Sequence, residues 1–291
     1  MAKEWAHPSD NFGSIYSYFF KNKNYKFNDF TNALTKAYEI QGSLCLGTSL
    51  NKLGYDHVFY VKLASGSVFS YLVNNGDTNA IRRTVNNILL DGPGLRAYRH
   101  FPNVGKRKSW AAADASKRGI ELSIISSHED EIYESVQNED KWGFETNFLD
   151  NSELEFGKDL NNWVIQNVLF KVLFPAEFHG QSAVEAAIEL SDEFNQNINK
   201  LEKVNIYTHE PAVRIISNKD ILKNASDRDH SLEYMVAAAL LYGDLKYEMY
   251  EESFQGFEKI NNLRKKIFVT EEPQFTKDYY EFSKRHISNS I

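Results

Sequence analysis

Hydrophobic residues recur at helical spacing through most of the first half of the chain. Residues 28–53 carry apolar side chains at intervals of three and four, with Asn28 or Asp29 placed to cap the start. Small and apolar residues continue over 58–73, and 78–90 has the pattern of another helix. Short polar or glycine-containing breaks separate these segments. The first half is therefore predicted to be mainly helical.

The second half mixes helical spacing with one alternating stretch. The segment 138–159 is acidic and irregular, which is typical of a domain boundary or a long loop. Residues 203–216 alternate apolar and polar side chains as a half-buried strand does. Helices are predicted over 182–197, 227–241 and 251–267. We therefore expect a mainly α protein with a helical domain over 1–166 and a smaller α+β domain over 167–291.

The composition indicates a globular intracellular protein. With 291 residues and 42% hydrophobic side chains, the chain can build a sizeable core. No stretch approaches the roughly 18 consecutive apolar residues that a membrane span needs, and the first ten residues lack the apolar core of a signal peptide. We therefore expect a cytoplasmic protein without a membrane partner.

Charge and cysteine content exclude two further classes. A net charge of -7 argues against nucleic acid as a partner, since phosphate binding needs a basic face. The single cysteine, Cys45, excludes an intrachain disulfide and an iron–sulfur cluster held by several thiolates. No spacing of His and Cys suggests a zinc site. We expect no metal and no cofactor.

Positive charge is concentrated in one stretch of this acidic chain, GLRAYRHFPNVGKRKSWAAADA at residues 94–115. Its basic residues are Arg96, Arg99, His100, Lys106, Arg107 and Lys108. Aromatic residues interleave with them, and the alanines that follow predict a tightly packed helix. Cations gathered against the overall sign favour a site for an anion, although a solvated surface loop is the alternative.

The same stretch closely resembles a segment of dehydratases in the MmgE/PrpD family of cofactor-independent lyases. Three other blocks resemble that family in the same order along the chain. They are HPSDN at 7–11, NVLFKVLFPAEFHGQSAVEAA at 167–187 and DRDHSLEYMVAAALLYGDL at 227–245. The resemblance implies a large helical domain and a smaller α+β domain with the active site in the cleft between them. It also implies a homodimer, and family members extend beyond both ends of this chain.

The resemblance further implies a reaction. It is the removal of water from 2-methylcitrate to give 2-methyl-cis-aconitate, in the methylcitrate cycle of propionate catabolism. Such a dehydration needs a base for a carbon-bound proton, positive charge for a carboxylate and an acid for the departing hydroxide. The residues that match the family's catalytic positions are His7, His57, Lys108, Lys171 and Tyr234.

Local sequence adds to each of these assignments. Pro8 favours extended backbone at His7, and Lys108 lies close to a predicted helix start, where backbone N–H groups attract anions. Lys171 lies in an apolar run, where it either reaches out of a core element or lies in a pocket. We take His57 or Tyr234 as the base or the acid, and Lys108 and Lys171 as carboxylate ligands.

Four further residues are candidates for binding a tricarboxylate substrate. They are Arg99, Arg107, His179 and His230. A guanidinium can bind a carboxylate with two parallel hydrogen bonds, which favours the arginines. His230 and Tyr234 are four residues apart and would share one face of a helix. Two alternatives stay open, namely a cis-aconitate decarboxylase-like lyase and a catalytically inactive remnant.

Overall fold

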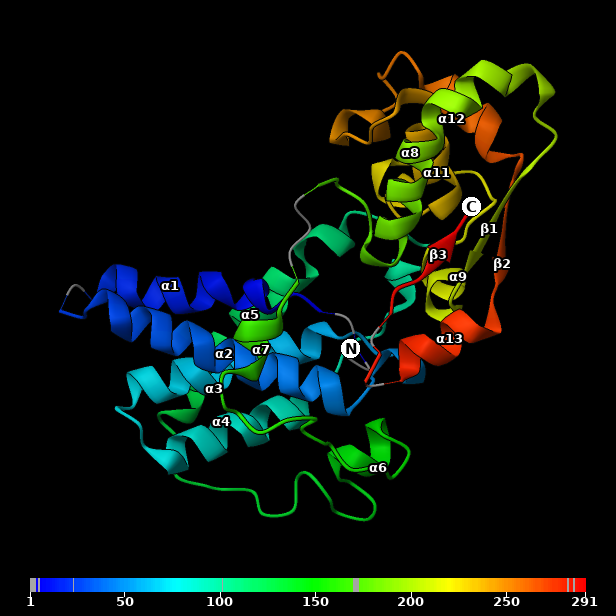
Figure 1. The fold of residues 1–291 in the computed structure, drawn as a ribbon. Helices are drawn as coiled ribbons and strands as arrows, with labels where there is room; N and C mark the ends of the chain where they lie inside the picture. Colours follow the sequence, from blue (N-terminus) through cyan, green and yellow to red (C-terminus); the bar gives the residue numbers. More distant parts are fainter. Residues whose placement is uncertain are drawn as a thin grey trace. The chain divides into compact units, whose positions relative to one another are not determined.

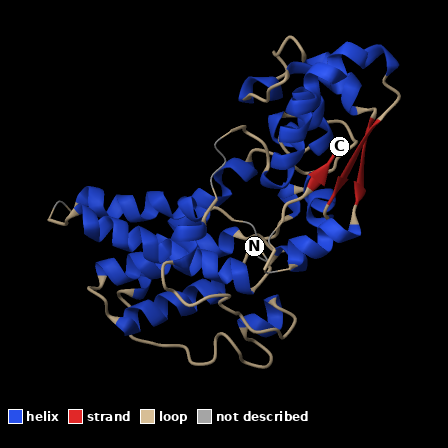
Figure 2. Ribbon diagram, in the orientation of Figure 1, coloured by secondary structure: helices blue, strands red, loops and turns tan. Residues whose placement is uncertain are grey.

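The computed structural model describes residues 4, 6–22, 24–100, 102–169, 173–281, 283–284 and 286–291. Contacts between residues group the chain into two compact units. One, the helical unit, comprises 2–97 and 107–168, and the other, the C-terminal unit, comprises 98–106 and 169–291. The described residues are mainly helical with one small sheet, as predicted (Figures 1 and 2). The division between 166 and 167 stays a prediction.

The described residues of the helical unit form seven α-helices. Their bounds are α1 Phe12–Lys21, α2 Phe27–Gly47, α3 Val58–Val73, α4 Thr78–Asp91, α5 Arg107–Ser126, α6 Phe144–Phe148 and α7 Trp163–Asn167. The described part of α3 is buried along most of its length, and it packs against α1, α2, α4 and α5. A helix that is apolar on nearly all sides is typical of the centre of a helical domain.

Helices α2, α3 and α4 begin within one residue of the predicted positions, whereas the pattern does not predict α1, α6 or α7. Helix α4 is capped by Asp77, whose carboxylate accepts hydrogen bonds from the backbone of Asn79 and Ala80. The predicted cap of α2 is wrong, because Asp29 lies inside the helix and its carboxylate accepts from the backbone of Lys26, at 2.9 Å. Helix α2 also ends at Gly47 and not at residue 53.

The part of the C-terminal unit that the structure describes combines six α-helices with a three-stranded sheet. The helices are α8 Gln181–Asn197, α9 Glu210–Ile216, α10 Ala225–Arg228, α11 Leu232–Tyr242, α12 Phe257–Arg264 and α13 Pro273–Tyr280. The strands are β1 Val204–Thr208, β2 Ile267–Glu271 and β3 Asn289–Ser290, in the order β2-β1-β3. Strand β1 is parallel to β2 and antiparallel to β3.

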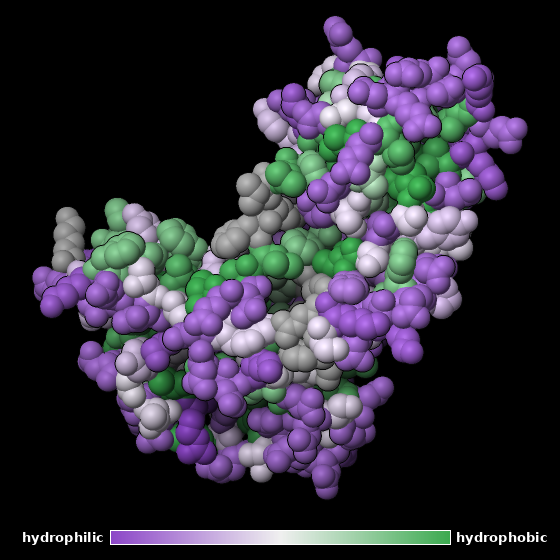
Figure 3. Space-filling model, viewed as in Figure 1, coloured by the Kyte–Doolittle hydropathy of each residue, from purple (hydrophilic) through white to green (hydrophobic). Residues whose placement is uncertain are grey.

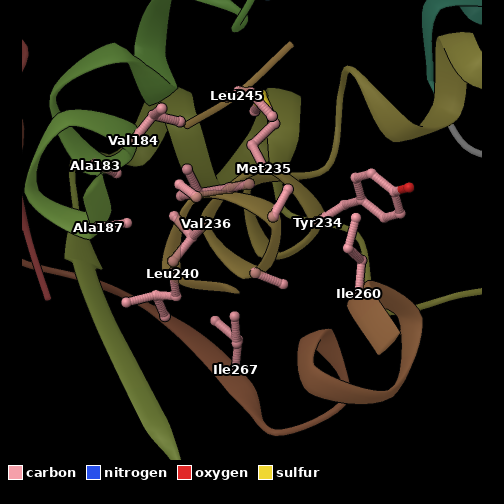
Figure 4. Close-up of a cluster of buried hydrophobic side chains, with 14 of the residues drawn as sticks. Ala183, Val184, Ala187, Tyr234, Met235, Val236, Leu240, Leu245, Ile260 and Ile267 are labelled. Atoms are coloured by element: carbon pink, nitrogen blue, oxygen red, sulfur yellow. The ribbon is translucent and has the colours of Figure 1, made fainter. Parts of the chain in front are cut away.

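Helix α11 forms the centre of this unit's core. All its residues from Leu232 to Leu241 are buried, and it packs against α8, α12 and β2. Figure 4 shows its side chains meeting Ala183, Val184 and Ala187 of α8 and Ile267 of β2. The helix ends at Gly243, whose φ of 63° is the left-handed conformation that glycine adopts without strain.

Three predicted elements of this unit are wrong in part. The stretch 203–216 is a strand only to Thr208, because Pro211 favours the first turn of a helix and α9 begins at Glu210. The stretch 227–241 is two helices, because Ser231 caps a new helix by accepting from the backbone of Tyr234. The stretch 251–267 is helical only within α12.

Candidate active site

The nine predicted site residues are distributed over both units. His7, His57, Arg107 and Lys108 belong to the helical unit. Arg99, His179, His230 and Tyr234 belong to the C-terminal unit. Lys171 lies outside the described residues.

His7 is exposed at the start of a short 3-10 helix, Pro8–Asn11. Its φ of -110° and ψ of 101° are extended, as predicted from the proline that follows. The end of this segment is anchored in the unit by Asn11, which is buried. Asn11 accepts a hydrogen bond from Ser65 of α3 at 2.7 Å and donates one to Gln41 of α2. The motif HPSDN thus fixes the loop that carries His7.

His57 immediately precedes α3 and is buried. Its Nδ1 lies 3.0 Å from Nη1 of Arg96 and 3.4 Å from Oδ1 of Asp56. The Arg96 contact joins residues 39 positions apart. It arises because two short segments pair: the backbone N–H of Asp56 donates to Gly94, at 2.9 Å, and that of Arg96 to the Gly54 carbonyl, at 3.1 Å.

A buried carboxyl group lies in the same region of the helical unit. Glu4 is 1% exposed, and it accepts hydrogen bonds from the backbone of Asn51, at 2.6 Å, and from the Ser49 hydroxyl, at 3.2 Å. Burial raises its pKa to about 7, although these hydrogen bonds and the charge of Arg96 act in the opposite direction. Nothing in the sequence pattern singles out Glu4.

Arg107 and Lys108 are the first two residues of α5, the alanine-rich helix that the sequence predicts. Lys108 is half-exposed and lies in the first turn of α5, whose backbone N–H groups add partial positive charge. The exposed Arg107 places its guanidinium 4.5 Å from the centre of the Trp110 ring. Ala111 is buried, so the helix packs closely while its basic start stays accessible.

Arg99 belongs to the C-terminal unit, in the 3-10 turn Ala97–Arg99. It is half-buried, with its guanidinium 5.1 Å from the centre of the Tyr98 ring. The loop that follows is held to the same unit, because Asn224 donates a hydrogen bond to the Val104 carbonyl at 3.3 Å. The basic stretch predicted as one cluster is therefore shared between the two units.

His179 is held in a buried cluster of the C-terminal unit. It is fully buried, with Nδ1 3.0 Å from a Glu177 oxygen and Nε2 3.2 Å from the Tyr279 hydroxyl. Burial raises the pKa of Glu177, but the charge and hydrogen bonds of His179 outweigh it and hold that pKa well below its usual range.

A second histidine, His209, completes this cluster. Its ring stacks on that of Tyr279 at 4.7 Å and lies 5.3 Å from that of His179. Its Nδ1 lies 3.3 Å from the Ser288 carbonyl oxygen. Burial, with the charge of His179, lowers the pKa of His209 to about 4. The sequence analysis does not single out His209 and Tyr279. They lie 70 residues apart, so no local motif links them, and only their residue types could have suggested a functional role.

His230 and Tyr234 do not share a helix. His230 lies in the turn before α11, half-buried, with Nδ1 2.6 Å from Oδ1 of Asp229. Tyr234 is fully buried on α11, and its hydroxyl donates to the Met249 carbonyl at 2.6 Å. That hydroxyl points away from the aliphatic side chains of the core (Figure 4). Burial raises the pKa of Tyr234 to about 12, so the phenol is protonated at neutral pH.

Among the described residues, no group of three or more His, Cys, Asp and Glu side chains is placed to hold a metal ion. Cys45 is buried in the helical unit, and burial raises the pKa of its thiol well above the usual value. No helix in the described part of the chain, in either unit, has the length and apolar character that crossing a membrane requires.

The chain belongs to the MmgE/PrpD family. The model of the MmgE/PrpD N-terminal domain matches residues 1–157, and that of the C-terminal domain matches residues 174–290. These matches confirm the family that the four sequence blocks indicate.

Within this family, the chain is similar to 2-methylcitrate dehydratases. The chain is 40% identical to the 2-methylcitrate dehydratase of Escherichia coli (strain K12) and 37% identical to that of Cupriavidus necator. It is 36% identical to the mitochondrial 2-methylcitrate dehydratase of Yarrowia lipolytica. Each match covers 100% of this chain but only 62%, 62% and 58% of the respective relative. The chain thus spans about three fifths of their length.

Proposed function

We propose that this chain acts as a hydro-lyase that removes water from 2-methylcitrate to give 2-methyl-cis-aconitate, in the methylcitrate cycle of propionate catabolism. The observation that carries the proposal is the identity of 36–40% with 2-methylcitrate dehydratases over the whole of this chain. A match of this extent includes both units and all nine candidate residues.

The proposed chemistry uses side chains alone. Removing a proton next to a carboxylate builds negative charge on that carboxylate, so cations close to it lower the barrier. Lys108 and Lys171 supply that charge, and His57 or Tyr234 supplies the base or the acid. His7 lines the site. The single cysteine excludes a cluster held by several thiolates, so we propose no cofactor and no metal.

Lys108 is the best-supported anion ligand of the described residues. Its ammonium group extends from the first turn of α5, where backbone N–H groups add partial positive charge. Arg107 precedes it on the same turn, and Arg99, His179 and His230 are the proposed further ligands of the tricarboxylate.

A binding experiment tests this assignment. Calorimetric titration with 2-methylcitrate in the presence of a chelator should show binding by the unaltered chain. Lys108→Ala should weaken binding by about 1.5–3 kcal/mol, the range for a hydrogen bond to a charged group. The matched control is Lys117→Ala on the same helix, where Lys117 is exposed and pairs with Glu121. Equal affinity in a folded Lys108→Ala variant would remove Lys108 from the site.

We also propose that the chain forms a homodimer in the cytoplasm. Helix α1 offers a surface for a second copy: Phe12, Tyr16 and Phe20 follow one another at four-residue spacing and are 47%, 47% and 67% exposed. Phe27, at the start of α2, is 76% exposed. Figure 3 shows hydrophobic side chains gathered on this face of the helical unit.

The chemistry of this aromatic face favours association with an identical face. No charged residue lies between Phe12 and Phe20, and large exposed aromatic patches are characteristic of protein interfaces. Light scattering at increasing concentration should show a dimer that Phe20→Glu weakens. Leu90→Glu, at a 56% exposed position on α4, is the control that should leave the dimer intact. A monomer at all concentrations would contradict the proposal.

A further inference from the structure

The side chain of Arg96 restricts what His57 can do. Nη1 of Arg96 lies 3.0 Å from Nδ1 of His57, and both residues are 7% exposed. At that distance and burial the two nitrogen atoms form a hydrogen bond that water does not readily replace.

The direction of this hydrogen bond follows from the chemistry of the two groups. A guanidinium has five N–H donors, no acceptor, and a pKa that keeps it protonated in proteins. Nδ1 of His57 must therefore accept, so it carries no proton. The neutral imidazole then holds its one proton on Nε2.

A second group competes for the same nitrogen. Oδ1 of Asp56 lies 3.4 Å from Nδ1 of His57 and would stabilise a proton there. That oxygen already accepts a hydrogen bond from the backbone of Val58, at 3.3 Å. Arg96 is closer to Nδ1 and cannot accept a proton, so its contact decides the tautomer.

The backbone holds Arg96 in this position. The N–H of Arg96 donates to the Gly54 carbonyl at 3.1 Å, and Tyr55 pairs with Leu95 in an isolated antiparallel bridge. The N–H of Asp56 donates to the Gly94 carbonyl at 2.9 Å, so backbone hydrogen bonds join the two segments on both sides of the Tyr55–Leu95 bridge.

We propose that Arg96 is a positioning residue that fixes His57 as a neutral imidazole with its proton on Nε2. His57 then donates a hydrogen bond from Nε2 to an anionic oxygen of the substrate and does not act as the base at that nitrogen. A neutral histidine that polarises a substrate oxygen is an established catalytic device. The carbon-bound proton must then be taken by a different group. This assignment of roles rests on the proposed function, whereas the tautomer itself does not.

Nitrogen NMR of the full chain labelled with ¹⁵N-histidine tests the tautomer without any substrate. The His57 signals are identified by their loss in His57→Gln. In the unaltered chain at neutral pH, Nδ1 should give the shift of an unprotonated nitrogen and Nε2 that of a protonated one.

Variants of Arg96 separate positioning from a merely structural role. Arg96→Met removes the donor and leaves Asp56 as the neighbour of Nδ1, so the two nitrogen shifts should exchange. Arg96→Lys keeps a cationic donor and should restore the original pattern. Arg118→Met is the matched control, since Arg118 pairs with Asp91 and should leave the His57 signals unchanged.

The NMR results test the tautomer of His57, and substrate binding tests the proposed function, so the two can fail independently. A protonated Nδ1 in the unaltered chain, or unchanged shifts in a folded Arg96→Met variant, would overturn the inference. If Arg96→Met does not fold, the unaltered chain and Arg96→Lys still decide it, because both should show the same tautomer. Failure to bind 2-methylcitrate would overturn the proposed function and leave the tautomer result standing.

Discussion

Gly66 of α3 and Gly119 of α5 lie against each other, backbone to backbone. A Cβ atom added to Gly119 would lie 2.5 Å from the Lys62 carbonyl oxygen and 2.9 Å from the backbone nitrogen of Gly66. A Cβ atom added to Gly66 would lie 3.0 Å from the Gly119 carbonyl oxygen. Because neither glycine has a side chain, α3, the central helix of the helical unit, can pack directly on α5, which carries Arg107 and Lys108 at its start.

Replacing Gly119 should destabilise the helical unit. Gly119→Ala forces a methyl group against backbone atoms that cannot move independently, and overpacking of this kind costs about 1–3 kcal/mol. Gly13→Ala is the control: Gly13 is exposed on α1 with no atom within 4 Å of its added Cβ, and alanine should stabilise that helix by about 0.5–1 kcal/mol. Urea denaturation measures both, and equal stability of the two variants would contradict the close approach.

The buried carboxyl of Glu4 should make the protein less stable as pH rises. Its pKa is raised by burial from 4.5 to about 7, so between these values the folded state holds a proton that the unfolded state has lost. The free energy of unfolding should fall by about 3 kcal/mol across that window, at 1.36 kcal/mol per unit. Glu4→Gln should abolish this part of the pH dependence, and the exposed Glu153→Gln should not. If the unfolding free energies of Glu4→Gln and the unaltered chain change with pH in parallel, Glu4 is not the source of this pH dependence.

His209 should have the opposite effect in nearly the same window. Burial, together with the charge of His179, lowers its pKa from 6.5 to about 4, against the opposing charges of Glu177 and Glu210. As pH falls from about 6.5 to 4, the unfolded state binds a proton that the folded state does not, so about 3 kcal/mol of stability should be lost.

His209→Phe tests this effect, because a phenyl ring can keep the stacking on Tyr279. The variant should lose the acid-induced decline and show a flatter curve of unfolding free energy between pH 6.5 and 4. His286→Phe, at an exposed position of the same unit, should keep the decline. The account of the buried cluster fails if His209→Phe declines as steeply as the unaltered chain.

Hydrophobic periodicity predicted the elements that bury a continuous face. Helix α3 runs over Val58–Val73 as its apolar pattern indicates, and α8 begins one residue before its predicted start. The periodicity gave wrong boundaries where a proline or a capping side chain determines the start of a helix. Pro211 starts a helix inside an alternating stretch, and Ser231 divides the predicted helix 227–241 into two helices.

The sequence predicts which residues are candidates for the site, but not the contacts that these residues make. The family resemblance picks out His57, and His179 is a further candidate for substrate binding, but the surroundings of both depend on tertiary contacts that spacing does not encode. Arg96 reaches His57 across 39 positions, and Tyr279 reaches His179 across 100. The predicted helix face shared by His230 and Tyr234 is wrong, because the turn at Ser231 separates them and leaves only Tyr234 on α11, where it is fully buried.

Turnover of 2-methylcitrate by the purified chain is the most direct test of the proposed dehydration. Proton NMR of the reaction, run with a chelator, follows the methyl and methylene signals of the product, which lie next to its double bond. The account predicts 2-methyl-cis-aconitate from the unaltered chain, and much less from Lys108→Ala than from Lys117→Ala. Release of carbon dioxide from cis-aconitate without dehydration of 2-methylcitrate would identify a decarboxylase instead. A folded chain that binds 2-methylcitrate and forms no product would contradict the account and identify a catalytically inactive member of the family.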